Sequence, residues 1–144
     1  MPEQAALREI RLLLPMAPDM EMVASQAATA VAEWARMSAD KVDEVRMAVV
    51  EACINAFEHS HAADKVLELT FTVLGIAEPE TLCVTVRDHG VGFAPECVED
   101  PCIETKLKAE RKRGWGIKII RGLMDDVKIQ SGADGTTVVM CKSR

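Results

Sequence analysis

Two polar side chains on a predicted helix could act on a bound ligand. Glu51 and Asn55 are four residues apart, so a helix presents them as a proton acceptor beside an amide oxygen that suits a hard cation. Glu44 and Glu58 fall on the same narrow arc at about 100° per residue. The opposite arc, from Val42 to Phe57, is broad and apolar. Periodicity alone favours a solvated stripe on an amphipathic surface helix. The width of the apolar arc supports a second interpretation, in which the helix is nearly buried and its polar stripe lines an internal cleft.

Two glycine clusters could bring the backbone close to a ligand. Asp88-His-Gly90-Val-Gly92 stands where a predicted strand ends, and a tight turn capped by its own aspartate is the other interpretation. Gly114-Trp-Gly116 opens a predicted helix, whose N-terminal N–H groups favour an anion such as phosphate. The second cluster lacks the third glycine of a dinucleotide-binding fingerprint, and the chain contains no Walker A motif.

A basic run precedes the second glycine cluster. Lys106, Lys108 and the segment 111–113 carry five positive charges and Glu110 one negative charge, so this stretch is +4 in a chain of −6. Beside a helix N-terminus, such a run favours a polyphosphate, although a solvated charge run has the same composition.

The elements that would position these residues alternate between strand and helix patterns. Paired hairpins imply an antiparallel component, so we predict an α+β fold: a two-layer α/β sandwich with a mixed, mostly antiparallel sheet and helices on one face. The predicted order is a strand Leu7–Leu14, a helix opened by Pro18 and Asp19 with Val23, Ala27, Val31 and Trp34 on one side, a helix capped by Asp40 and running to about His59, strands 65–74 and 82–87, a long loop, a helix 114–124, and strands 127–130 and 136–141.

Composition excludes several classes of protein. The 144 residues suit one domain spanning 1–144, and 49% hydrophobic residues exclude a disordered chain. Aromatic residues make up 3%, and the net charge is −6, which argues against direct binding of nucleic acid. No apolar run approaches the roughly 20 residues of a membrane span, so a cytoplasmic protein is expected.

The five cysteines are odd in number and scattered, without a C-x-x-C pair. Cys53, Cys83 and Cys141 lie in apolar patterns, where a free cysteine behaves as a small hydrophobic residue. We therefore predict reduced thiols in a reducing compartment.

The ordered set of motifs resembles the GHKL ATPase superfamily. That set is Glu51-x-x-x-Asn55, Asp88-x-Gly90-x-Gly92, Gly114-x-Gly116 and Gly135-Thr136-Thr137. Within the superfamily, the run from Glu51 to His59 and the short length resemble the anti-sigma-factor serine/threonine protein kinases of the sporulation and general-stress type.

The resemblance implies specific ligands and roles. The ligands are ATP and Mg²⁺, with Glu51 as catalytic base and Asn55 as the Mg²⁺ ligand. The implied ATP-binding residues are Asn55, Asp88 at the adenine amino group, Gly90, Gly92, Lys106 and Arg113 in a lid of about 93–113, Gly114, Trp115, Gly116, Ile117 and Thr136.

The resemblance also implies partners. Members of the family form homodimers, bind a sigma factor or an equivalent regulator, and phosphorylate a STAS-domain anti-anti-sigma protein. A histidine-kinase catalytic domain, or a nucleotide-binding regulatory module without phosphotransfer, is the alternative interpretation.

Overall fold

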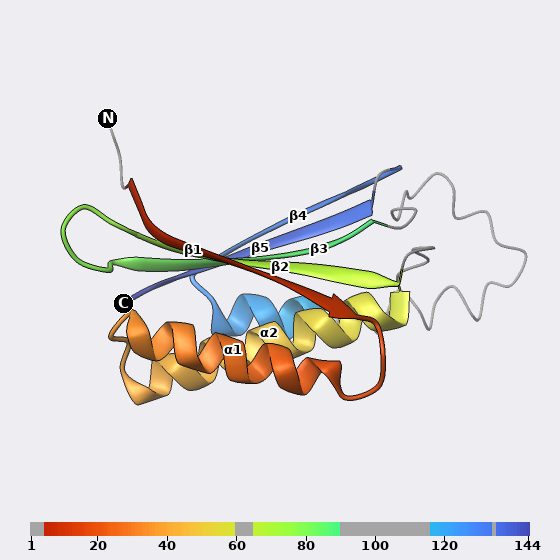
Figure 1. Ribbon diagram of the computed structural model, residues 1–144, viewed down its shortest axis with the longest axis horizontal. Coiled ribbons are helices and arrows are strands. Elements are labelled where there is room, and N and C mark those ends of the chain that lie inside the picture. Colours follow the sequence, from red (N-terminus) through yellow and green to blue (C-terminus); the bar gives the residue numbers. More distant parts are fainter. Residues whose placement is uncertain (1–4, 60–64, 90–115, 134) are drawn as a thin grey trace, which may run out of the picture.

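The computed structural model describes residues 5–59, 65–89, 116–133 and 135–144. One sheet covers a layer of helices (Figure 1). The elements are β1 (Ala5–Pro15), α1 (Met20–Trp34), α2 (Ala39–His59), β2 (Val66–Gly75), β3 (Thr81–Asp88), a helix at 116–123, β4 (Asp126–Gly132) and β5 (Gly135–Ser143). This order agrees with the predicted one. In the described ranges, no helix is long and apolar enough to cross a membrane.

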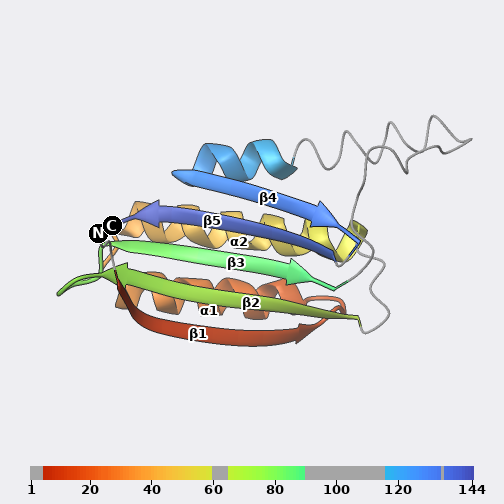
Figure 2. The same ribbon diagram turned by 90° about the horizontal axis from the view of Figure 1, so that it is seen from above.

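The five strands form a single sheet in the order β1-β2-β3-β5-β4 (Figure 2). β2–β3 and β4–β5 are the two predicted hairpins, and β5 lies directly beside β3. Every strand pair that the structure describes is antiparallel. The prediction of an α+β sandwich with helices on one face is confirmed.

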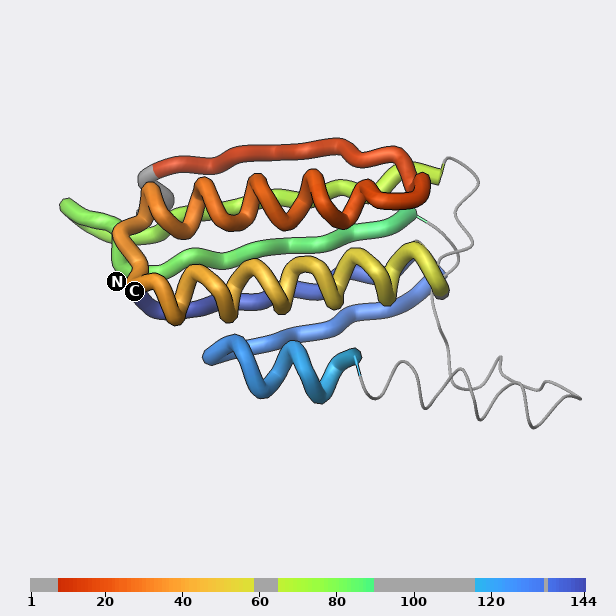
Figure 3. Tube along the Cα trace, turned by 90° about the horizontal axis from the view of Figure 1, so that it is seen from below, coloured from red at the N-terminus to blue at the C-terminus, as the bar shows by residue number. Residues whose placement is uncertain are grey.

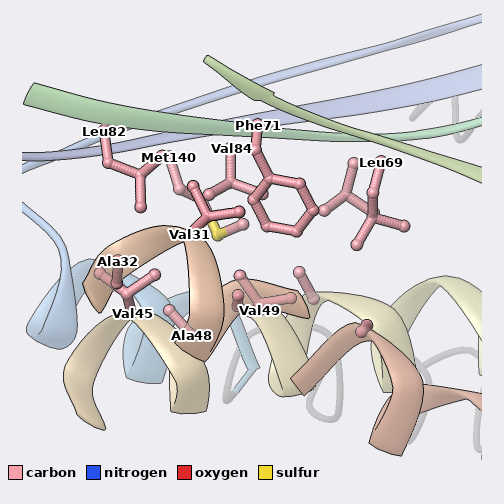
Figure 4. Close-up of a cluster of buried hydrophobic side chains, with 14 of the residues drawn as sticks. Val31, Ala32, Val45, Ala48, Val49, Leu69, Phe71, Leu82, Val84 and Met140 are labelled. Atoms are coloured by element: carbon pink, nitrogen blue, oxygen red, sulfur yellow. The ribbon is translucent and has the colours of Figure 1, made fainter. Parts of the chain in front are cut away.

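The helices lie on one face of the sheet, with helix 116–123 alongside α2 (Figure 3). Alternate residues of β2 and β3 are buried against them, as expected for strands with one covered face. Figure 4 shows the resulting core, in which both helix layer and sheet contribute: Val31, Ala32, Val45, Ala48, Val49, Leu69, Phe71, Leu82, Val84 and Met140.

Two details of the helices differ from the prediction. The buried face of α1 is made by Ala24, Ala28, Val31 and Ala32, whereas Trp34 is half exposed. The predicted stripe was wrong in part, because α1 packs through small residues that let it approach α2 closely.

The second difference is the start of α2. Asp40 lies inside the first turn, and Ser38 takes the capping position, where its hydroxyl accepts a hydrogen bond from the Lys41 N–H at 3.3 Å. The Ser38 carbonyl also accepts the Val42 N–H at 2.9 Å.

The prediction of reduced thiols is wrong for two cysteines. Cys83 of β3 and Cys141 of β5 are opposite each other in the strand register and form a disulfide. The pairing of β3 with β5 brings together residues 58 positions apart, which sequence spacing alone does not reveal. Cys53 is a buried free thiol, as predicted. Burial raises the pKa of Cys53 to about 12, with a smaller contribution from the carboxylate of Glu21.

Candidate nucleotide-binding site

The last residue of β3 forms one part of the candidate site. Asp88 is 6% exposed and stands opposite Thr136 in the β3–β5 register. Because paired residues of an antiparallel sheet project from the same face, the carboxylate and the hydroxyl share the side that the helices cover. Thr136 also exchanges a hydrogen bond with the Ser131 hydroxyl at 3.0 Å.

Gly135 explains how the chain reaches this arrangement. Its φ of 123° suits glycine, and a Cβ there would collide with the Asp88 carbonyl oxygen. A glycine thus allows β5 to begin directly against the end of β3. In the sequence, Gly135 stands out as part of Gly135-Thr136-Thr137, and the paired glycines of Gly132-Ala-Asp-Gly135 are the signal for this backbone role.

A second part of the site lies between two helices. Gly116 is buried against α2: a Cβ at this position would lie 3.2 Å from Glu51 Oε2 and 3.6 Å from Asn55 Oδ1. The structure therefore brings together residues from two motifs that are more than 60 positions apart in the sequence.

The position of helix 116–123 beside α2 shows whether the polar stripe of α2 faces a cleft or solvent. Glu51 and Asn55 are half buried, which favours the internal cleft at this point, whereas Glu58 is exposed. Ile120 of the facing helix is buried in the core and Ile117 packs partly against it. Apolar contacts therefore hold the glycine end of this helix close to the two polar groups.

The two parts lie toward the same end of the molecule (Figure 2). β3 ends there at Asp88, α2 reaches it with its C-terminal half, and the described part of helix 116–123 starts there. Such an arrangement offers one ligand an acceptor at the sheet and backbone N–H groups at a helix start.

The chemistry of the donors fits one hard cation held together with a phosphate ligand. In the described part of the chain, no group of three or more His, Cys, Asp or Glu side chains is placed to hold a metal ion alone. Mg²⁺ normally keeps several waters and takes one or two protein oxygens plus substrate phosphates. The half-buried Asn55 amide beside Glu51 meets that requirement.

Several predicted site residues lie outside the described residues. They are Gly90, Gly92, Lys106, Arg113, Gly114 and Trp115, together with the predicted lid at about 93–113. Their roles stay predictions.

Comparison with known proteins supplies the family. Residues 14–142 match the family described as the histidine kinase-like ATPase domain. The chain is 37% identical over 107 residues to an anti-sigma F factor of Anoxybacillus flavithermus, covering 72% of this chain and 70% of that protein. It is 32% identical over 138 residues to the serine-protein kinase RsbW of Listeria monocytogenes, covering 93% and 86%.

The fold also has a counterpart among solved structures. The crystal structure of the RsbU and RsbW domains of Rv1364c from Mycobacterium tuberculosis superposes with a TM-score of 0.69 at 17% identity. That match covers 95% of this chain and 33% of the other, and it concerns the fold alone.

The chain belongs to the histidine kinase-like ATPase family, in the group of the anti-sigma-factor serine-protein kinases. It is accordingly an ATP-using protein serine/threonine kinase.

Proposed function

We propose that this kinase acts as an anti-sigma factor, which phosphorylates a serine of a STAS-domain anti-anti-sigma protein and binds a sigma factor or an equivalent regulator. The observation that carries the catalytic part is the closeness of Gly116 to α2, where a Cβ on this glycine would lie 3.2 Å from Glu51 Oε2 and 3.6 Å from Asn55 Oδ1. It puts a carboxylate beside the helix start that would hold the phosphates. The names of the relatives support the regulatory part.

The adenine base would bind at the sheet. Asp88 accepts a hydrogen bond from the exocyclic amino group, and its neighbour Thr136 supplies a second polar group on the same face. A buried carboxylate is suited to this task because its hydrogen bond is charge-assisted and shielded from water.

Phosphoryl transfer would take place between the helices. Glu51 accepts the proton of the serine hydroxyl while the serine oxygen bonds to the γ-phosphorus and the bond to the ADP oxygen breaks. Asn55 would hold Mg²⁺, which offsets the negative charge of the phosphates when it is bound. Gly116 has no side chain, so the backbone N–H groups at the helix start can reach the phosphates.

The residues outside the described ranges enter this proposal from the sequence. Gly90 and Gly92 would lie at the adenine, and Gly114 and Trp115 would complete the ATP contacts together with Ile117, which belongs to the described helix. Lys106 and Arg113 would close over the phosphates from the lid at about 93–113. We propose in addition that the chain forms a homodimer in the cytoplasm and needs neither nucleic acid nor a membrane.

A transfer assay tests the proposal. Purified protein is incubated with γ-labelled ATP, Mg²⁺ and each STAS-domain protein of the same genome, and the phosphorylated residue is mapped by mass spectrometry. We expect an acid-stable phosphoserine on one of these proteins, and loss of transfer when Mg²⁺ is chelated. An acid-labile phosphohistidine would indicate a histidine-kinase domain instead, and tight ATP binding without transfer would indicate a regulatory module.

A further inference from the structure

A buried lysine far from the predicted motifs joins three elements. Lys142 of β5 pairs with Leu82 in the sheet, so its side chain lies on the face that the helices cover. The residue is 7% exposed. Its ammonium group donates a hydrogen bond to the Leu123 carbonyl at 2.6 Å and forms an ion pair with Glu44 Oε1 at 2.9 Å. Asp125 Oδ1 lies 4.0 Å away.

This position suits a cation. Leu123 ends helix 116–123, where carbonyl groups lack helical partners and the helix dipole is negative. Glu44 belongs to α2, so one ammonium group links the C-terminal end of the short helix to α2. A charge buried this deeply requires such partners, because it has lost most of its hydration.

The link and the candidate site lie at matching positions on the two helices. Helix 116–123 runs antiparallel to α2 (Figure 3), with Leu123 linked to Glu44 at one end and Gly116 against Glu51 at the other. Seven residues separate the two points on each helix, which is about 10 Å at about 1.5 Å per residue. A shift at the linked end therefore moves Gly116 by a similar amount relative to Glu51.

The short helix depends on such contacts for its position. Its described part has eight residues, fewer than the roughly 12–15 at which an isolated helix becomes marginally stable. The apolar side chains of Ile120 and Met124 hold it against the core. Non-directional apolar contacts set its distance from the core, whereas directed contacts set its position along its own axis. The contacts of Lys142 are the ones that join it to α2; the Asp125 N–H, just after the helix, donates to the Cys141 carbonyl of β5 at 2.9 Å.

We propose that Lys142 is a positioning residue for phosphoryl transfer: by linking Leu123 to Glu44, it sets the position of Gly116 relative to Glu51. This inference rests on the proposed function of the site. The partners of the Lys142 ammonium group are Leu123, Glu44 and Asp125, so Lys142 acts on Gly116 and Glu51 through the helix.

The test compares Lys142→Met, which keeps the length of the side chain, with Lys142→Arg, which keeps its charge and donors. Lys128→Met, on the exposed part of β4, is the matched control. We expect Lys142→Met to lower kcat at least about tenfold, since small displacements of reacting groups have effects of this order. The KM for Mg-ATP should change less than about threefold, because the adenine end is held by the sheet. Lys142→Arg should restore most of kcat, and Lys128→Met should leave both constants unchanged.

A second variant covers the case in which Lys142→Met does not fold. Glu44→Gln removes only the partner charge, on a side chain that is 40% exposed, and should lower kcat in the same direction by a smaller factor. Unchanged kcat in both Glu44→Gln and Lys142→Met would overturn the proposal, as would a Lys142→Arg variant no more active than Lys142→Met.

Hydrogen exchange without nucleotide separates this inference from the proposed function. In Lys142→Met the amides of 117–124 should exchange at least about tenfold faster than in the wild type, whereas β2 should be unchanged. If the wild type transfers no phosphoryl group, the proposed function fails; if the exchange of 117–124 is unaffected, the role of Lys142 fails.

Discussion

The two parts of the candidate site are built on different physical foundations. Asp88 and Thr136 face each other through strand register, with Gly135 closing the end of the sheet, so backbone hydrogen bonds determine their relative position. Glu51 and Gly116 meet through a helix–helix contact that depends on side-chain packing. The register of paired strands can change only by whole residues, whereas a short helix can slide along its axis by a fraction of a turn. We therefore expect binding to depend on the sheet part and chemistry on the helix part.

The largest effect should come from Glu51→Gln, which keeps the shape of the side chain and removes the proposed base. We expect phosphoryl transfer to fall by about 10²–10⁴-fold, the usual contribution of a positioned base, while Mg-ATP affinity changes little. Single-turnover transfer and calorimetry measure the two quantities. Asp43→Asn, an exposed carboxylate on the same helix, is the control and should be fully active. Normal transfer by Glu51→Gln would remove this residue from the mechanism.

A pair of glycine variants on one helix tests the close approach. Gly116→Ala places a methyl group 3.2 Å from Glu51 Oε2, so the helix or the carboxylate must shift, and kcat should fall by about tenfold or more. Gly122→Ala has open space around its added carbon and should leave kcat unchanged. Since alanine favours a helix over glycine by up to about 1 kcal/mol, Gly122→Ala should also raise the melting temperature slightly. Equal activity of the two variants would show that the contact is not needed.

Substitutions in the sheet part of the site should change the affinity for ATP. In the proposed binding mode, Asp88→Ala leaves the adenine amino group without its acceptor. An unpaired group costs about 1–3 kcal/mol, so ATP affinity should fall about tenfold or more. Calorimetric titration with ATP and with ADP should give the same loss, because the two share the adenine end. Thr136→Val keeps the shape of the neighbouring side chain and should have a smaller effect. Unchanged affinity in Asp88→Ala would place adenine elsewhere.

The smallest expected effect is on the reactivity of Cys53, which lies on the core side of α2. Because this thiol is protected only while α2 is packed, its reactivity shows whether the variants proposed here leave the helix in place. Because burial raises the pKa of the folded thiol from its ordinary 9.0 to about 12, the thiol is almost fully protonated at pH 8. Alkylation of Cys53 at pH 8, followed by peptide mapping, should be much slower in the folded protein than in urea.

The same pKa predicts a pH dependence of stability. Above pH 9 the unfolded thiol loses its proton while the folded one keeps it up to about 12. The free energy of unfolding should therefore decrease between these values by up to about 1.4 kcal/mol per pH unit from this group. Cys53→Ala should remove that part of the slope, and an unchanged slope would contradict the burial effect.

Much of the fold could be predicted because its signals are local. Alternation in β2 and β3 and glycine at the β4–β5 turn mark the hairpins, since strand faces and turn conformations depend on neighbouring residues. The buried face of α1 could not be predicted in full, because Val23 and Ala24 both suit an apolar stripe and only the packing against α2 selects Ala24. The cap of α2 was misplaced by two residues for a similar reason, since Ser38 and Asp40 are both good capping residues.

The amino-acid sequence by itself determined the element order, the residue types of the site and the family resemblance, because these depend on short-range patterns and motif order. Only the tertiary structure decided which distant residues meet: Asp88 with Thr136, Cys83 with Cys141, Gly116 with Glu51, and Lys142 with Glu44. Strand order and helix register arise from burying all apolar faces at once in one core. From the sequence alone, a lysine in a strand is expected at the surface. Lys142 is buried because the tertiary structure places the Leu123 carbonyl and the Glu44 carboxylate around its ammonium group.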